Sequence, residues 1–182
     1  MRLIDKAGIA GALATALSVT SPARAEPQGH VALRVAPCGV GTDGSVWDAT
    51  RICGGFVGDL LLFRRRNRDF GFGPYVEVLT AGLWDARFGG GASLLVPVTE
   101  SYPLVLSLGA FDHELRAASL GGTVFWGVRS YNFDSPYNWT AGLYASAYRD
   151  LDSRGDTLVS VGIELDGFFL AAPFLLAFGA LR

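Results

Sequence analysis

Most of the chain consists of segments in which apolar residues alternate with small or polar ones. In residues 70–80, for example, Phe72 and Val76 fall on one face while Gly73 and Glu77 fall on the other. Successive side chains of a strand point to opposite faces, so this period of two predicts β-strands. The alternation predicts eight strands, at residues 30–37, 54–64, 70–80, 86–97, 103–112, 119–130, 138–148 and 156–166.

The two faces of these segments differ in a way that indicates which one meets the solvent. One face is aliphatic and aromatic, and the other is mostly Gly, Ser and Thr with an isolated charge per strand. In a soluble barrel, the face exposed to water would be rich in Lys, Glu and Thr. A face of small residues instead suits a crowded barrel interior. Short polar turns favour an antiparallel meander, and closing it leaves no unpaired edge in a lipid environment. The apolar face is therefore expected to look outward at lipid.

In its alternating strands, polar connections and aromatic residues near strand ends, the chain resembles the small outer-membrane β-barrels of Gram-negative bacteria. The resemblance implies an all-β fold, an antiparallel up-and-down meander closed into a transmembrane β-barrel of about eight strands. It also implies contact with outer-membrane lipid, lipopolysaccharide and the barrel assembly machinery.

The first 25 residues have the layout of an export signal. Arg2 and Lys6 precede an apolar stretch that closes on Ala23-Arg24-Ala25, which is typical of a secretory signal peptide. We expect cleavage before Glu26, leaving residues 26–182 as a single barrel domain in the outer membrane.

Composition narrows the function further. Half of the chain is hydrophobic and 18% is charged, yet no run of 18 apolar residues follows the signal peptide, which disfavours a helical membrane protein. The only lysine of the chain is Lys6, so the exported part has no basic footprint for nucleic acid.

Residues 168–181 are apolar throughout and fit either a final strand or a helix beginning near Pro173.

Cys38 and Cys53 bracket a polar stretch. In an exported chain, such a pair predicts a disulfide, here tying the first loop and stabilising the fold by about 3 kcal/mol. Loop 38–53 would then be a surface for an extracellular partner. Within it, Gly39 to Gly44 match the dinucleotide fingerprint in letters, but no helix follows to hold a pyrophosphate, so a surface loop is expected.

Few residues suggest catalysis or metal binding. His113, between Asp112 and Glu114, is a weak candidate for a general base, and a solvated loop is the simpler interpretation. The acidic stretch 150–156 lacks the spacing of a calcium loop and predicts a hydrophilic hairpin tip. No metal or cofactor is expected.

Charges on the small-residue face form a more informative set. Alternation places six of them inside the barrel, where they should pair across strands because a lone buried charge is costly. The six are Arg34, Asp59, Glu77, Arg87, Arg129 and Glu164.

Four functions remain open from the sequence. The first is a non-enzymatic barrel with a largely plugged polar lumen and a structural or surface-interaction role in the envelope. A barrel enzyme acting on lipid A or phospholipid, with His113 as base, and a small-solute pore are alternatives. A soluble exported barrel that binds an apolar ligand is the fourth.

Overall fold

The structure, a computed structural model, describes residues 26–182 apart from 83–84, 115–116, 130–134, 153 and 170–182. The expected signal peptide, residues 1–25, lies outside the described residues. No helix in the described part of the chain is long and apolar enough to cross a membrane.

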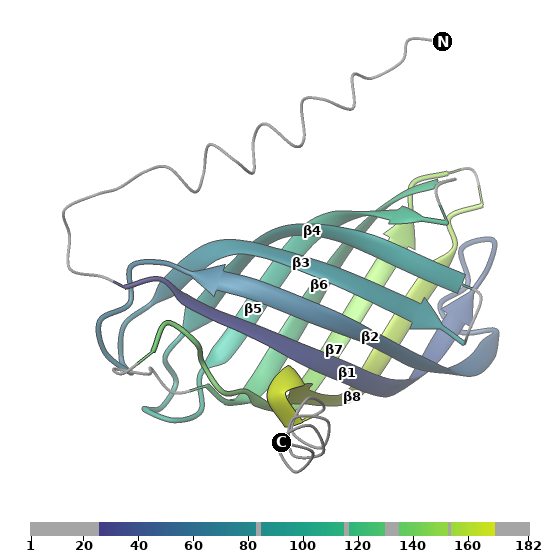
Figure 1. Cartoon of the computed structure of the whole chain (residues 1–182). Coiled ribbons are helices and arrows are strands. Elements are labelled where there is room, and N and C mark those ends of the chain that lie inside the picture. The colour runs from purple at the N-terminus through teal and green to yellow at the C-terminus, as the bar shows by residue number, and fades with distance from the viewer. Residues whose placement is uncertain (1–25, 83–84, 115–116, 130–134, 153, 170–182) are drawn as a thin grey trace, which may run out of the picture.

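Eight strands form one closed antiparallel barrel, as predicted (Figure 1). Each strand pairs with the next along the chain, and β1 pairs with β8 to close the circle. The strands are β1 (Gln28–Gly41), β2 (Ala49–Leu61), β3 (Gly71–Ala81), β4 (Asp85–Val96), β5 (Leu104–His113), β6 (Ala117–Val128), β7 (Ala141–Asp150) and β8 (Thr157–Asp166).

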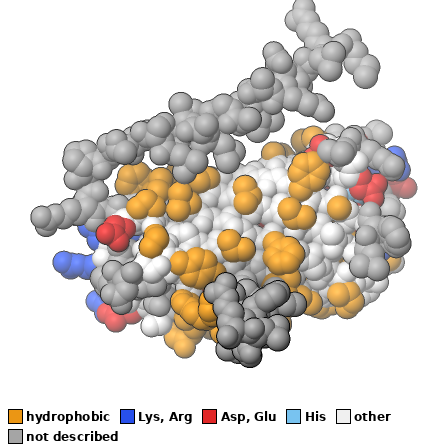
Figure 2. Space-filling model, viewed as in Figure 1, with side chains coloured by type: hydrophobic (Ala, Val, Ile, Leu, Met, Phe, Trp, Pro, Cys, Tyr) orange, Lys and Arg blue, Asp and Glu red, His pale blue; other side chains and the backbone are white. Residues whose placement is uncertain are grey.

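Burial alternates along the strands as the period of two predicts. In β3, Tyr75 and Glu77 are buried inside the barrel while Phe72, Val76 and Val78 are exposed on its outer wall. Figure 2 shows hydrophobic side chains spread over the middle of the outer surface and charged ones gathered at the two ends. The predicted assignment of the apolar face to the exterior is confirmed.

Aromatic, hydroxyl and charged side chains of the described residues are buried inside the barrel. The rings of Tyr75, Phe111 and Tyr148 form one group in tilted and edge-to-face contact, with centroids 6.3 Å apart for the first pair and 4.9 Å for the second. Hydroxyl groups also pair inside the barrel, for example those of Ser93 and Ser107 at 2.6 Å. An eight-stranded barrel has an interior that side chains alone can fill.

The first two strands are longer than their residue types indicate. Pro37 and Gly39 are poor strand residues and predict an early end, yet β1 continues to Gly41. Pairing with β8 explains why β1 continues. The two strands pair at Val35 and again at Cys38, so the ladder between them passes over Pro37.

The predicted disulfide-tied surface loop therefore needs a correction. Cys38 and Cys53 are bonded as predicted, with Cα atoms 5.8 Å apart, but both lie inside strands and are fully buried. The bridge joins β1 to β2 within the barrel wall, and only residues 42–48 form the connection.

The barrel closes without the apolar tail. β8 ends at Asp166 and already pairs with β1, so no ninth strand is required. Residues 167–169 are helical, and the rest of the predicted segment 168–181, from residue 170 onward, lies outside the described residues.

Candidate functional site

The six charged residues singled out by alternation all point into the barrel. Five lie on strands, and Arg129 directly follows β6. All six side chains are almost completely buried. The structure groups these and further ionisable residues into a central cluster, a cluster near the chain ends and a cluster at the opposite end of the barrel.

The central cluster is built around Arg34. Its Nη1 lies 2.7 Å from Glu77 Oε1, and its Nε lies 2.8 Å from Glu164 Oε2. The same guanidinium stacks 4.8 Å from the centroid of the Tyr144 ring. Arg34 and Glu164 are also backbone partners in the closing pair of strands, so closure of the barrel brings these distant residues together.

The cluster near the chain ends joins Asp59, Arg129 and His30. Arg129 Nη2 contacts Asp59 Oδ1, and His30 Nδ1 lies 2.9 Å from the same oxygen. His30 Nε2 lies 3.4 Å from Glu164 Oε1, which links this cluster to the central one. Sequence reasoning missed His30, although it shares the inward parity of Arg34 along β1.

These two linked clusters have a simple charge balance. They contain the guanidinium groups of Arg34 and Arg129 and the three carboxylates of Asp59, Glu77 and Glu164. A protonated His30 imidazole would bring the total to zero. Neutrality matters here because an uncompensated charge in a buried interior is costly.

Arg87 belongs to the third cluster and pairs with a residue that alternation did not select. Its Nη1 lies 2.9 Å from Asp150 Oδ1, and Asp150 also accepts a hydrogen bond from Ser119 Oγ at 2.5 Å. Placing Asp150 at a hydrophilic hairpin tip was wrong, because β7 continues to this residue and turns it inward. Asp152 does lie in the exposed connection, where its carboxylate accepts from the N–H of Gly155.

His113 is the last residue of β5 and is not a solvated loop residue. Its Nδ1 lies 2.5 Å from Asp150 Oδ2, and its Nε2 lies 2.8 Å from Asp85 Oδ1. A general base needs one ring nitrogen facing the nucleophile. Here both nitrogens face carboxylates, and the nearby Ser119 hydroxyl is directed at Asp150 instead.

No metal centre is formed by the described residues. Among them, no group of three or more His, Cys, Asp or Glu side chains is arranged to hold an ion. Each charged cluster contains an arginine, whose guanidinium is always protonated, so it competes with any cation for the same carboxylates.

The described end of the connection between β6 and β7, residues 135–140, lies beside the start of β1 and pairs with it. Gly29 N–H donates to the carbonyl of Pro136 at 2.7 Å, and Asn138 N–H donates to that of Gly29 at 2.8 Å. The Tyr137 hydroxyl donates to Asp166 at 2.8 Å. Burial, with this carboxylate close by, raises the pKa of Tyr137 to about 12. β1 begins before the point where its pairing with β8 starts, at Ala32. These contacts therefore supply backbone partners for the first residues of β1, which β8 does not reach.

At the opposite end, the connection 42–48 is short and ordered by its own side chains. The Asp48 carboxylate accepts from Thr42 N–H at 2.8 Å and from the Thr42 hydroxyl at 2.9 Å. Hydrogen bonds from Ser45 and Thr42 hold the pKa of Asp48 below its usual value. Val46 and Trp47 are exposed at the tip.

The fold defines the class of protein. Eight antiparallel strands closed into a barrel, with apolar side chains outside and charges inside, form the architecture of small outer-membrane barrels. No family model and no curated protein sequence matches the chain. Among solved structures, it is similar to Ail, the attachment invasion locus protein of Yersinia pestis, crystallised with the heparin analogue sucrose octasulfate. The two are 14% identical, with a TM-score of 0.42, over 78% of this chain and 99% of Ail.

Proposed function

We propose that the protein is an integral outer-membrane barrel with a plugged interior and no catalytic activity, serving the envelope structurally or through its exposed ends. The observation that carries the proposal is the inversion of polarity across the wall. Leu108 and Val161 are 73% and 61% exposed on the outside, whereas Arg34 and Glu164 are buried inside. Water would destabilise such an exterior, and a bilayer would stabilise it.

Aromatic side chains at the strand ends support the same placement. Trp126 and Trp139 are exposed near one end of the barrel, and Trp47 is exposed near the other. Tryptophan is enriched where a bilayer meets water, because its ring is apolar and its N–H is polar. The distribution fits a membrane between these two levels.

The alternatives have less support from the geometry. A pore needs a continuous polar path, and the edge-to-face rings of Phe111 and Tyr148 and the ion pairs of Arg34 take up space inside the barrel. A hydrolase needs an accessible base, but both nitrogens of His113 face carboxylates. A soluble carrier of apolar ligands needs an apolar cavity, and the interior is charged.

For a surface-interaction role, we propose the connection 42–48 as the contact. It lies within the stretch 38–53 and presents the exposed Val46 and Trp47 near the acidic Asp43. Its internal hydrogen bonds hold this tip in one shape, which lowers the entropic cost of binding.

A reconstitution experiment tests the proposed function. The chain from Glu26 onward, refolded into phospholipid vesicles, should migrate on gels with heat-modifiable mobility and should add no single-channel conductance to a planar bilayer. Stable conductance would establish a pore, and a monomer that stays soluble without detergent would establish a soluble carrier. Lipid hydrolysis that disappears in His113→Ala would establish the enzyme.

A further inference from the structure

The connection between β2 and β3 concentrates positive charge at one end of the barrel. Residues 64–69 include four arginines and one aspartate, and Arg65, Arg66 and Arg68 are exposed. The Asp69 carboxylate accepts from the backbone N–H groups of Arg65 and Arg66 at 2.8 and 2.9 Å. The single acid of the loop therefore shapes the backbone and leaves the arginine side chains pointing elsewhere.

These arginines lie directly beside the apolar wall. Phe63 and Phe70 flank the loop and are 66% and 61% exposed, and Phe72 continues the apolar surface along β3. Girdles of aromatic residues flank the apolar band of outer-membrane barrels at both interfaces. The arginines that follow them are thus at the level where lipid phosphates lie in the proposed membrane.

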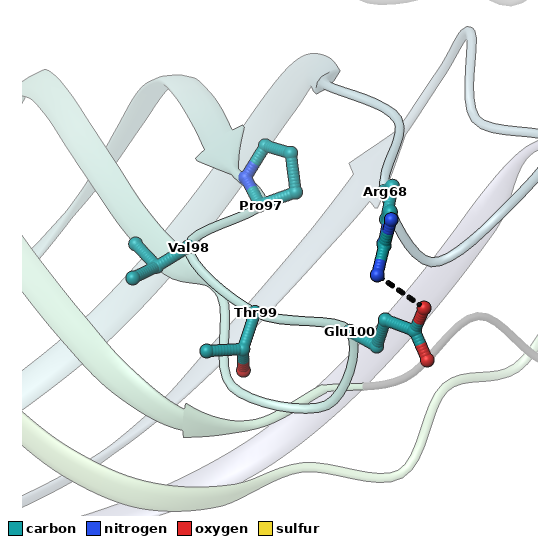
Figure 3. A pocket seen from close by; sticks show the side chains of 5 residues that line it. All are labelled: Arg68, Pro97, Val98, Thr99 and Glu100. Atoms are coloured by element: carbon teal, nitrogen blue, oxygen red, sulfur yellow. Dashed lines mark ion pairs between the residues drawn. The ribbon is translucent and has the colours of Figure 1, made fainter.

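The neighbouring connection between β4 and β5 forms the other side of a hollow. Pro97, Val98, Thr99 and Glu100 line, together with Arg68, an open space of about 610 Å³ (Figure 3). Arg68 Nη2 lies 2.9 Å from Glu100 Oε1, but the side chains of this pair are 77% and 61% exposed, so water weakens it. Among the described residues, no carboxylate lies within ion-pair distance of Arg65 or Arg66.

The opposite end of the barrel has a different charge pattern. There Asp43, Asp48, Glu114 and Asp152 are exposed acids. Two of its arginines face a carboxylate, Arg51 toward Asp85 at 3.5 Å and Arg154 toward Asp152 at 3.9 Å. Among the connections in the described part of the chain, the loop 64–69 alone carries three exposed arginines.

We propose that the loop 64–69 binds the phosphate of an anionic phospholipid, with Arg65, Arg66 and Arg68 around the headgroup and the acyl chains along Phe70 and Phe72. This inference rests on the proposed membrane location. Guanidinium groups suit phosphate because several N–H donors are presented in one plane. An apolar surface directly below the charges favours a lipid over free phosphate, which has no acyl chain to bury.

Lipid selectivity of the refolded chain from Glu26 onward tests the proposal. Spin-labelled phosphatidylglycerol and phosphatidylcholine report, by electron paramagnetic resonance, how strongly each lipid associates with the barrel in phosphatidylcholine vesicles. Each arginine near an anionic lipid strengthens association by about fivefold, so wild type should prefer phosphatidylglycerol and lose this preference in high salt. The variant Arg65→Gln/Arg66→Gln/Arg68→Gln should show a ratio near one.

A matched control separates a local site from total charge. Arg51→Gln/Arg149→Gln/Arg154→Gln removes the same number of exposed positive charges at the opposite end, and it should keep the preference. Replacing the three loop arginines by lysine should keep most of it. Equal losses in the two glutamine variants, or no preference in an inserted wild-type barrel, would overturn the headgroup site alone. Failure of the wild type to insert would overturn the proposed function as well.

Discussion

Arg34 illustrates how a permanently charged side chain is kept inside the barrel. Its guanidinium has carboxylates at 2.7 and 2.8 Å and an aromatic face at 4.8 Å. Removing such a group from water is costly, and attraction to two fixed carboxylates offsets that cost only while both remain in place. The arrangement makes each member of the cluster dependent on the others.

Substitution of Arg34 tests this dependence. Arg34→Met should lower the free energy of unfolding by about 3–5 kcal/mol, because Glu77 and Glu164 are left buried with one guanidinium fewer. Urea unfolding of the barrel in detergent micelles measures the change. Arg154→Met is the matched control, since Arg154 is 75% exposed and lies 3.9 Å from Asp152; it should cost about 0–1 kcal/mol. Similar losses in both variants would show that the central cluster does not stabilise the barrel.

At the scale of the element, β4 shows why glycine recurs in these strands. Gly89 and Gly91 lie on the inward face beside Phe111 and Tyr75, whose rings occupy the interior. A Cβ at Gly91 would come within 2.0 Å of the Leu108 carbonyl oxygen and 2.5 Å of the Gly109 Cα atom. The run of glycines therefore lets β4 and β5 approach closely while large rings lie in the interior.

A pair of glycine substitutions tests this close approach. Gly91→Ala should destabilise the barrel by about 1–3 kcal/mol, because β4 must move away from β5 to admit the methyl group. Gly54→Ala on β2 should be tolerated, since the nearest atom to its Cβ would be the Arg34 carbonyl oxygen at 3.8 Å. Unfolding in micelles compares the two variants. Equal stability would mean that β4 has room to spare.

At the scale of the whole molecule, stability depends on what covers the outer wall. Large hydrophobic side chains such as Leu108, Trp126 and Val161 are exposed around the barrel, between two ends that carry the charged residues of the connections (Figure 2). A contiguous apolar surface of this extent is unfavourable in water and favourable in hydrocarbon.

Introducing arginine on this wall tests the lipid contact. Val161→Arg, in the middle of β8, should lower stability by about 2–4 kcal/mol and reduce the yield of heat-modifiable barrel in vesicles. Val46→Arg, in the connection 42–48, introduces the same side chain outside the wall and should assemble like wild type. If Val161→Arg inserted as well as Val46→Arg, the wall would not face lipid.

Ser107→Ala, which removes one interior hydrogen bond to Ser93, should lower the free energy of unfolding by about 1 kcal/mol.

The sequence by itself determined the strands, their two faces and the inward direction of Arg34, Glu77 and Glu164. These follow from alternation, which is a local property of extended backbone and is readable wherever polar and apolar residues take turns. The disulfide followed from the cysteine count and the expected export signal. Strand limits near Pro37 and Asp150 did not follow, because pairing with neighbouring strands overrode the local turn signals.

Only the tertiary structure decided which charges meet. Arg34 and Glu164 are 130 residues apart and become neighbours because β1 pairs with β8, while Arg87 finds Asp150 across the interior. The stagger of strands and the closure of the barrel set these pairs, and both depend on contacts among all eight strands. His30 and His113 belong to these clusters for the same reason. Each lies near the end of a strand, so the register with the neighbouring strands decides which carboxylates its ring meets.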